Sequence, residues 1–426
     1  MNKKLQIGIM VIVALFSLTV NAQSDKCATM QRLQKSLAKD PTLTQRMLES
    51  EKATRQWISN HARNKKESGE VIVIPTVVHV IWNDPIENVS DDQILSQIDV
   101  LNEDFRLMNV DSLDDQHPFW QFTIDAEIEF CLAQQDPDGN PTTGITRTET
   151  DVVAWDENYF DDIKSTANGG LDNWDPTKYL NIYVVKLDGS TLGFASFPVE
   201  LATNPDLDGV VIRYEAFGTE GTAGSGDFSV NDGGRTGTHE VGHWLNLRHI
   251  WADTICGDDF VDDTEPAEES NYGCPTFPHR PNNQCDSGAD GEMYMNYMDY
   301  VDDNCMNMFT AGQADRMHAS LNESRSGLLT SIGCQLPTAI KEVNFLNSIA
   351  IYPNPNNGQF TLSINLNNNN AVRASLINLV GANVKDIGVI SNQTSTIDVT
   401  DVSTGAYYLR VSNSTTSTIK KVFITK

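Results

Sequence analysis

The residues of this chain that could do chemistry are concentrated in the run Thr-His-Glu-Val-Gly-His-Trp-Leu-Asn-Leu-Arg-His, which ends at His249. His239 and His243 are four residues apart, so on a helix they project from one face and can hold one Zn²⁺ through their imidazoles. Glu240 follows the first histidine and is suited to take a proton from metal-bound water as a general base, without binding the metal itself. The run predicts a catalytic metal site.

A third ligand is expected from His249, six residues past His243. It lies off the face that an uninterrupted helix would present, so the helix must end before it. Asn246 is the expected end, because Asn tolerates the left-handed conformation that terminates helices. Three histidines and a water form the open tetrahedral site of a catalytic zinc, whereas a structural zinc has four protein ligands. The alternative is a surface helix that carries these residues by chance.

A second motif stands downstream at 295–300, in the run Met-Asn-Tyr-Met-Asp-Tyr. It resembles the Met-turn that lies beneath the zinc in metzincins, with Met298 as the turn methionine and Tyr300 two residues on. A loop methionine that only fills a gap in the core is the alternative.

The chain has 426 residues and a net charge of −28, which argues against nucleic acid and anionic membrane surfaces as partners. Residues 1–22 read as a signal peptide, with Lys3 and Lys4 before an apolar run and Ala22 at a small-residue cleavage site. The protein is therefore expected outside the cytoplasm, where disulfides can form.

Residues 23–69 are polar with helix-like apolar spacing, and they end near the basic stretch 63–66, which a protease could cut. This segment is interpreted as a removable pro-segment. Cys27 could occupy the open zinc position as a thiolate and keep the enzyme latent. A disulfide or an idle thiol is the alternative.

Residues 70–336 are expected to form an α+β domain, a twisted mixed sheet with backing and active-site helices and a loop-rich C-terminal part. Strands are expected at 71–82, 124–131 and 180–185, and a capping box at Ser90 opens a helix through Phe105. Residues 192–198 resemble an edge strand, to which an extended peptide substrate could add. A plain surface strand is the alternative.

The loop after His249 carries four carboxylates and a hydroxyl between Cys256 and Thr264. A bound Ca²⁺ would relieve their mutual repulsion, and a solvated acidic loop is the alternative. Four cysteines fall in this half of the domain and allow two disulfides, whose connectivity cannot be derived from spacing. A further capping box at Thr310 predicts the helix that closes the domain.

The composition changes at 337–349, interpreted as a linker, and 350–426 alternates like a small antiparallel β-sandwich. This tail resembles the C-terminal sorting domain of the type IX secretion system, which implies the export machinery as a partner. A carbohydrate- or protein-binding accessory module is the alternative.

The zinc run, the Met-turn and the cysteine-rich loop between them resemble the pappalysin family of metzincin metalloproteases, in its bacterial lysin-like branch. The resemblance extends from about Cys27 to Cys334. Where the family commonly has Gly, this chain has Asn246. Implied by the resemblance are zinc ligands at His239, His243 and His249, Glu240 as general base and acid, Tyr300 steadying the tetrahedral intermediate, Cys27 as latency switch, calcium near Asp259, Asp263 and Thr264, and disulfides Cys256–Cys285 and Cys274–Cys305.

Family members often cleave before Arg, using an acidic group that follows the Met-turn. Here that segment is Asp302-Asp303-Asn304, so the preference for Arg or Lys weakens if Asn304 takes the key position. The expected function is a secreted, monomeric, zinc-dependent endopeptidase made as a latent zymogen, released or held at the cell surface. The rival functions are a non-enzymatic, metal-stabilised adhesin or binding protein, and a zinc amidase or glycan hydrolase.

Overall fold

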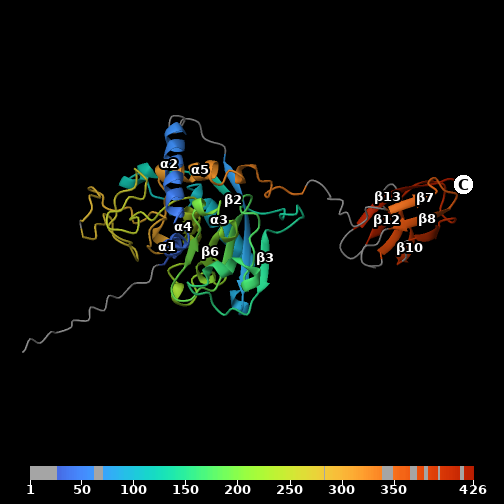
Figure 1. The fold of residues 1–426 in the computed structure, drawn as a ribbon, viewed down its shortest axis with the longest axis horizontal. Helices are drawn as coiled ribbons and strands as arrows, with labels where there is room; N and C mark the ends of the chain where they lie inside the picture. Colours follow the sequence, from blue (N-terminus) through green and yellow to red (C-terminus); the bar gives the residue numbers. More distant parts are fainter. Residues whose placement is uncertain are drawn as a thin grey trace, which may run out of the picture. The chain divides into compact units, whose positions relative to one another are not determined.

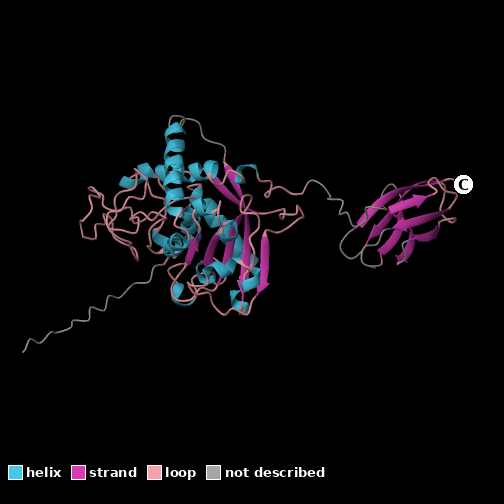
Figure 2. Cartoon of the chain, viewed as in Figure 1, coloured by secondary structure: helices cyan, strands magenta, loops and turns pink. Residues whose placement is uncertain are grey.

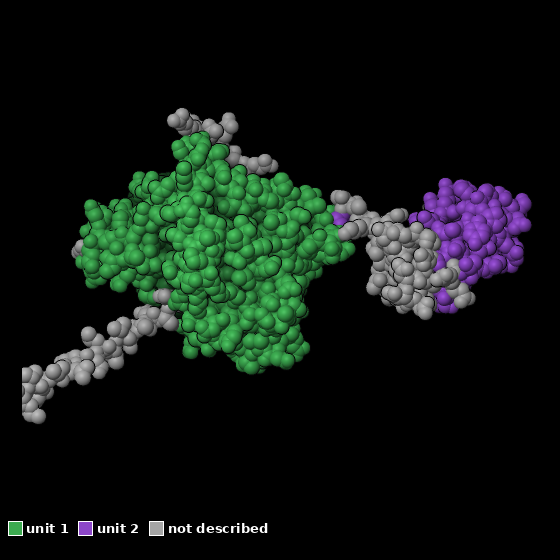
Figure 3. Space-filling model, in the orientation of Figure 1, with its two compact units in different colours: residues 1–336 green, residues 337–426 purple. Residues whose placement is uncertain are grey.

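The computed structural model describes residues 26–61, 71–282, 284–337, 349–364, 372–378, 382–391, 394–412 and 417–426. The expected signal peptide, the basic stretch 63–66 and residues 338–348 of the expected linker lie outside the described residues. The chain divides into two compact units, residues 1–336 and 337–426 (Figure 3). Among the described residues, no helix is both long enough and apolar enough to cross a membrane.

A mixed six-stranded sheet forms the centre of the first unit (Figures 1 and 2). All of its pairings are parallel except that of the edge strand β5, which runs antiparallel to β6. The strand order is β2-β1-β4-β6-β5, and β3 pairs with the second half of β1. The strands are β1 (Ile72–Trp82), β2 (Ile128–Leu132), β3 (Ile145–Glu149), β4 (Leu180–Val185), β5 (Gly193–Ala195) and β6 (Val210–Arg213). The mixed sheet and its edge strand agree with the prediction.

One strand begins later than the sequence pattern predicts. β2 starts at Ile128 instead of residue 124. Glu127 has φ +54°, a left-handed backbone that cannot continue a strand. The alternation of apolar residues therefore extends past the real strand boundary.

In the described part of this unit there are five α-helices, and two of them cover the sheet face that carries the zinc motif. α3 packs against β2 and α4, and α4 packs against β5 and β6. The helices are α1 (Thr29–Lys39), α2 (Leu43–His61), α3 (Asp91–Phe105), α4 (Arg235–Trp244) and α5 (Ala311–Glu323).

The predicted capping box at the start of α3 is only half formed. The Ser90 hydroxyl accepts from the Gln93 amide nitrogen at 3.1 Å. The Gln93 side chain does not bond back to Ser90 and instead donates to the carbonyls of Tyr214 and Phe217 at 3.1 and 2.8 Å. The cap at Thr310, before α5, is complete as predicted.

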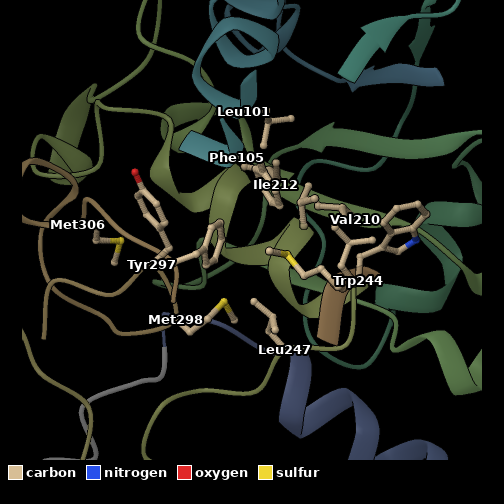
Figure 4. Packing of buried hydrophobic residues seen from close by; sticks show 14 of the residues in the cluster. Leu101, Phe105, Val210, Ile212, Trp244, Leu247, Tyr297, Met298 and Met306 are labelled. Carbon is tan, nitrogen blue, oxygen red and sulfur yellow. The ribbon is translucent and has the colours of Figure 1, made fainter. Parts of the chain in front are cut away.

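The main core lies between the sheet and these helices. Strand residues alternate between faces, so Ile182 and Val184 of β4 join the core beneath α3 and α4, whereas Tyr183 and Val185 join a second cluster on the opposite face. Figure 4 shows Leu101 of α3, Ile212 of β6 and Trp244 of α4 converging with residues of the downstream loops. The zinc motif is thus built into the main core of the unit.

The two N-terminal helices pack on the rest of the first unit. α1 contacts the edge strand β5, and α2 lies beside α5 (Figure 1). Leu33 and Leu43 bury against Phe197, just beyond the edge strand. The Arg32 guanidinium donates to both carboxylate oxygens of Glu200 at 3.1 and 3.2 Å, and both side chains are buried. The expected pro-segment is therefore docked beside the zinc motif.

Three disulfides brace the unit, two of them in the long loops between α4 and α5 (Figure 2). They pair Cys256 with Cys285 and Cys274 with Cys305, the same pairs that the resemblance implies. A third, Cys131–Cys334, joins β2 to the end of the unit across 203 positions. Cys27 is a free, buried thiol.

The second unit consists of two antiparallel sheets, in the orders β10-β9-β12-β13 and β11-β8-β7. Its core is aliphatic, with Leu362, Leu376 and Leu409 fully buried. The predicted antiparallel β architecture is confirmed. The strands are β7 (Ile349–Tyr352), β8 (Gln359–Ile364), β9 (Val372–Ile377), β10 (Asn383–Ile390), β11 (Thr394–Asp398), β12 (Gly405–Ser412) and β13 (Ser417–Ile424).

Candidate active site

α4 presents His239 and His243 on one face, and the chain then turns back sharply. The helix ends at Trp244, and Asn246 adopts the left-handed conformation with φ +79°. The Leu247 amide donates to the Gly242 carbonyl at 2.9 Å, which closes the helix end. This turn brings His249 back to the other two histidines, as the spacing predicts.

The left-handed turn gives a stability prediction. Asn246→Ala is expected to lower the free energy of unfolding by about 1 kcal/mol, because a Cβ without a compensating side-chain hydrogen bond is strained at this φ. Asn246→Gly removes that strain and is expected to change stability by less than about 0.5 kcal/mol. Urea unfolding of the three proteins checks this. An alanine variant as stable as the parent would mean that the turn is not strained.

The three histidines converge through their Nε2 atoms. The His243 Nε2 lies 3.2 Å from the Nε2 of His239 and 3.1 Å from that of His249. Each Nδ1 has its own partner. That of His239 lies 2.7 Å from the Tyr297 carbonyl, that of His243 2.9 Å from the Leu247 carbonyl, and that of His249 2.8 Å from the Asp253 carboxylate. Protons on the Nδ1 atoms leave three Nε2 lone pairs directed to one point, the donor set that a zinc ion requires.

Burial keeps the imidazoles of His239 and His243 neutral. It lowers the pKa of His239 to about 3, with His249 contributing, and it lowers the pKa of His243 well below its usual value. Neutral imidazole is the metal-binding form. The Cys27 Sγ joins the same group, in which all candidate ligand atoms lie within 4.8 Å of one another.

Glu240 lies beside this group and is itself buried. Burial raises the pKa of its carboxyl group to about 8, and hydrogen bonds from Cys27 Sγ at 3.4 Å and Thr29 Oγ1 at 3.1 Å oppose the rise. Gly193 of β5 makes room for it, because a Cβ there would come within 2.9 Å of the Glu240 Cγ. The carboxylate is thus held between the edge strand and the histidines.

The Met-turn lies where the motif predicts. Met298 is fully buried and packs under α4, where a Cβ on Gly242 would approach its sulfur to 2.5 Å. The Tyr300 hydroxyl lies 3.2 Å from His249 Nε2 and 3.4 Å from the Cys27 carbonyl. Tyr300 is therefore within reach of anything bound at the convergence point.

A buried ionic group fastens α4 to α3 and the Met-turn. Asp104 of α3 accepts from Arg235 at 2.6 Å, from Thr238 at 2.5 Å and from the Tyr297 hydroxyl at 3.0 Å. Burial raises the pKa of Asp104 to about 7, although Arg235 opposes the rise. Each of these partners lies more than 100 positions from Asp104 in the sequence, and no local pattern indicates them.

The predicted edge strand is not free in this chain, because residues 26–28 lie along it. The Ala28 amide donates to the Gly193 carbonyl at 3.0 Å, and the Leu192 amide donates to the Lys26 carbonyl at 2.7 Å. Thr29 continues the contact by accepting from the Ala195 amide at 2.9 Å. The N-terminal segment covers the surface to which an extended peptide would add.

A small pocket next to the histidines is lined by Asp299 of the Met-turn and by Asp303, which follows the turn. Lys26 is another lining residue, with its Nζ 3.8 Å from Asp302, and the charges of Asp299 and Asp303 also act on it. Burial lowers the pKa of Lys26, and these three carboxylates oppose that effect. Asp303 lines this pocket, whereas Asn304 is exposed and does not.

The residues expected to bind calcium are only partly brought together. The Thr264 hydroxyl donates to the buried Asp259 at 2.9 Å. Asp263 is engaged elsewhere, accepting from the Thr310 hydroxyl at 2.6 Å and the Gly312 amide at 2.9 Å at the start of α5. Within the described residues, the histidine and cysteine group is the single cluster with three or more metal-binding side chains.

Comparison with known proteins places this site in a family. The peptidase family described as pregnancy-associated plasma protein-A matches residues 158–322, and the secretion system C-terminal sorting domain matches residues 350–425. An extracellular metalloprotease of Coccidioides posadasii is 30% identical over 260 residues, which cover 60% of this chain and 79% of that protein.

Two solved structures from Tannerella forsythia are also similar. Mature mirolysin in complex with a cleaved peptide is 45% identical, covers 62% of this chain and 97% of its own, and has a TM-score of 0.57. A promirolysin mutant is 40% identical, covers 72% of this chain and 97% of its own, and has a TM-score of 0.63. The chain therefore belongs to the pappalysin family, as a secreted metalloprotease that ends in a secretion-system sorting domain.

Proposed function

We propose that this protein is a zinc-dependent endopeptidase made as a latent zymogen, with a preference for a basic residue after the scissile bond. The observation that carries the proposal is the convergence of three imidazole Nε2 atoms beside the buried Glu240, at the edge of the sheet. The family membership decides against the adhesin alternative.

His239, His243 and His249 would hold the zinc, since each Nδ1 is already tied to a carbonyl or carboxylate and each Nε2 faces the convergence point. When bound, zinc supplies Lewis acidity toward the peptide carbonyl and toward a water molecule. Glu240 accepts a proton from the attacking water and passes it to the leaving amine. Tyr300 donates a hydrogen bond to the developing oxyanion, and Met298 supports the histidines from below.

The acidic pocket supports the preference for a basic residue. Lys26 of the pro-segment already lies there with Asp302, so a substrate Lys or Arg can occupy the same volume after the pro-segment leaves. Because Asp303 lines the pocket and Asn304 does not, an acidic wall is retained. A main chain added along β5 would carry the residue into this pocket from the Leu192 end of the strand.

Cys27 is the proposed latency switch. Its thiol lies within the histidine group and donates to Glu240 at 3.4 Å, so it occupies the position of the attacking water and engages the proton acceptor. The pro-form of mirolysin covers 72% of this chain and the mature form 62%, which supports residues 23–69 as the removable pro-segment and 70–336 as the catalytic domain.

Cys27→Ala in the full-length chain is expected to raise its proteolytic activity about tenfold, because the open metal position is then accessible to water. The increase is limited because the Arg32–Glu200 pair and the contacts along β5 still hold the pro-segment in the cleft. Activity is measured on a quenched peptide before any cleavage of the chain, followed by gel. An unchanged rate would exclude Cys27 as the lock.

Calcium is proposed near Asp259, with Asp263 and Thr264 in the same loop. Burial raises the pKa of Asp259 to about 7, so a divalent cation would stabilise its ionised form. We expect calcium to raise the melting temperature of the full-length chain and Asp259→Asn to abolish the increase. Equal melting temperatures of the parent with calcium and with a calcium chelator would contradict this site.

Export and processing complete the proposal. The unit at 350–426 follows the linker at 337–349. We propose that the type IX export machinery recognises this unit and that it is then removed. The enzyme acts on protein and peptide substrates as a monomer, either released or retained at the cell surface.

The test is digestion of an unstructured protein by chain matured near residues 63–66, with cut sites mapped by mass spectrometry. We expect cuts before Arg or Lys that a zinc chelator abolishes and added zinc restores. If zinc-loaded protein without its pro-segment makes no cuts, the proposed function is wrong. Cuts without a basic preference would reject the role of the acidic pocket alone.

A further inference from the structure

A second pocket flanks the histidines, between α2 and the catalytic domain. Met47 and Glu51 of α2 form one wall, and Phe197, Arg248 and Arg316 are among the residues of the other. The Phe197 ring packs edge-on against the His243 ring, with centroids 5.7 Å apart. The Phe197 side chain therefore lies between this pocket and His243 of the proposed metal site.

The pocket already holds a carboxylate. Arg316 Nη1 and Nη2 donate to the two carboxylate oxygens of Glu51 at 3.1 and 2.9 Å. The Arg316 side chain is 1% exposed and that of Glu51 16%. The guanidinium also donates hydrogen bonds to two backbone carbonyls, that of Phe260 at 3.3 Å and that of Asn246 at 3.4 Å. A two-pronged arginine–carboxylate pair of this kind is directional as well as strong.

A second arginine shares the site. The Arg248 guanidinium lies 4.3 Å from the centre of the Phe260 ring, and that of Arg316 lies 5.7 Å from the same ring. Among the described residues, Arg316 forms an ion pair only with Glu51, and Arg248 forms none within 4.0 Å. Removal of α2 would take away Glu51, the ion-pair partner of the largely buried Arg316, and would leave Arg248 with only the through-space attraction of Asp253 and Asp258. An unpaired buried charge is costly, and an incoming anion offsets that cost.

The two pockets lie at opposite ends of the edge segment. The acidic pocket borders Leu192, just before β5, and the arginine pocket borders Phe197 and Val199, just after it. A peptide added along β5 spans both ends. If a basic residue after the scissile bond enters the acidic pocket, the residues before the scissile bond extend toward Arg248 and Arg316.

We infer that removal of the pro-segment uncovers a carboxylate-binding subsite at Arg248 and Arg316, which takes an acidic side chain located before the scissile bond. The inference rests on the proposed endopeptidase function and on the direction that the basic preference sets. The mature enzyme then prefers substrates in which an acidic residue precedes, and a basic residue follows, the bond that is cut. In the zymogen Glu51 occupies this subsite, as Lys26 occupies the acidic pocket.

Carboxylates near the same end of the cleft favour the opposite charge. When α1 leaves, Glu200 and Asp161 lose Arg32, which donates to the first and lies 3.5 Å from the second. If these acids dominated, a basic residue would be preferred before the scissile bond. The two outcomes are opposite in sign, so one experiment separates them.

The experiment uses protein that is produced as the full-length chain and then matured by removal of the pro-segment. Its substrates are a series of quenched fluorescent peptides. The parent peptide carries one Arg after the scissile bond and Gln at every position before it. In each derivative one Gln becomes Glu or Lys. We expect Glu at one position to raise kcat/KM about tenfold, mainly through KM, and Lys there to lower it. The advantage should shrink as salt is added, because the subsite becomes partly exposed.

Two arginine variants and one control locate the effect. Arg248→Gln is expected to remove most of the Glu advantage while the parent peptide is still cleaved. Arg316→Lys keeps the charge but loses the two-pronged geometry, and it should weaken the preference without removing the buried cation. Lys178→Gln removes one exposed positive charge elsewhere on the domain, 60% exposed and paired with Asp175, and should leave the preference unchanged.

Cleavage of the parent peptide with no Glu preference at any position would overturn the inference, as would a preference that both arginine variants retain. Absence of all cleavage by zinc-loaded protein would instead reject the proposed function. A binding measurement then tests the subsite without hydrolysis. It uses a labelled peptide that spans residues 40–61 and the matured chain. We expect Glu51→Gln in that peptide to weaken binding about tenfold. Equal binding of the two peptides would overturn the inference without reference to hydrolysis.

Discussion

Glu240→Ala in the matured chain is expected to lower kcat/KM by about 10²- to 10⁴-fold while the zinc content stays at that of the parent. Glu240 contributes no atom to the convergence point of the three Nε2 atoms, so its loss leaves the metal ligands in place. The loss removes the group that can take a proton from water and deliver it to the leaving amine. The effect should fall on kcat, because substrate binding along β5 does not involve this side chain.

Glu240→Gln sharpens the same test. The amide retains the shape of the side chain against Gly193 and can still accept a hydrogen bond, but it cannot take up a proton. We expect it to be nearly as inactive as the alanine variant. Glu220→Gln, at an exposed position of the same domain, is the control and should be fully active. A Glu240 variant with parental kcat, or one that loses its zinc, would show that the carboxylate has a different role.

The convergence of the three histidines is predictable from the sequence because the relevant constraints are local. A helix places residues four apart on one face, and Asn246 provides the left-handed turn that the spacing to His249 demands. The edge strand is predictable for a similar reason, because Pro198 directly follows a short run of apolar and small residues. Short-range geometry thus accounts for the histidines, Glu240 and the strand beside them.

The contacts that position the site join distant segments, and composition does not reveal them. Thr29 reaches Glu240 across 211 positions, and Cys131 pairs with Cys334 across 203. Gln93 looks like half of a capping box but binds the carbonyls of the loop before the zinc helix. In each case a polar side chain has several possible partners in the sequence, and only the packing of helices on the sheet selects one.

The same limit applies to the charge pattern of the cleft. The sequence shows an acidic segment after the Met-turn and an arginine within the zinc run, without indicating what either faces. In the fold, the proposed pro-segment supplies Lys26 to the acidic segment and Glu51 to Arg316, whose guanidinium faces the same Phe260 ring as that of Arg248. A pro-segment that must be displaced by substrate is expected to use the charges that the substrate uses. This makes the pro-segment a guide to specificity.

Asp208→Asn is expected to lower the free energy of unfolding of the catalytic domain by about 3–5 kcal/mol. Asp208 and Arg325 are both completely buried, and Arg325 donates to the two carboxylate oxygens at 3.0 and 2.8 Å. Asp208 also accepts from the Trp244 indole at 2.9 Å and from Ser196 at 2.9 Å. The pair therefore joins the end of the zinc helix to the edge strand, and the amide leaves the Arg325 cation buried without a counter-charge.

A double variant separates the charge from the packing. Arg325→Met in the Asp208→Asn background removes the orphaned cation and should recover part of the lost stability, although it gives up the stacking of the guanidinium 3.8 Å from the Trp244 ring. Chemical unfolding of the parent, the Asp208→Asn variant and the double variant, with their disulfides intact, measures the free energy of unfolding of each. Additive losses in the double variant would mean that the two side chains do not act as a pair.

The pH dependence of the same comparison tests the sign of the interaction. Burial alone would raise the pKa of Asp208, but the charge and hydrogen bonds of Arg325 outweigh burial, and the net pKa lies below the ordinary value of 3.8. A carboxyl group whose pKa is lower in the folded than in the unfolded chain stabilises the fold above the unfolded pKa, and the stabilisation is lost as pH falls through the folded pKa. The difference in stability between the parent and Asp208→Asn should therefore be constant from neutral pH down to about pH 4 and shrink in stronger acid. A difference that instead grew as the pH fell from 7 to 4 would mean that burial dominates and that Asp208 takes up a proton on folding.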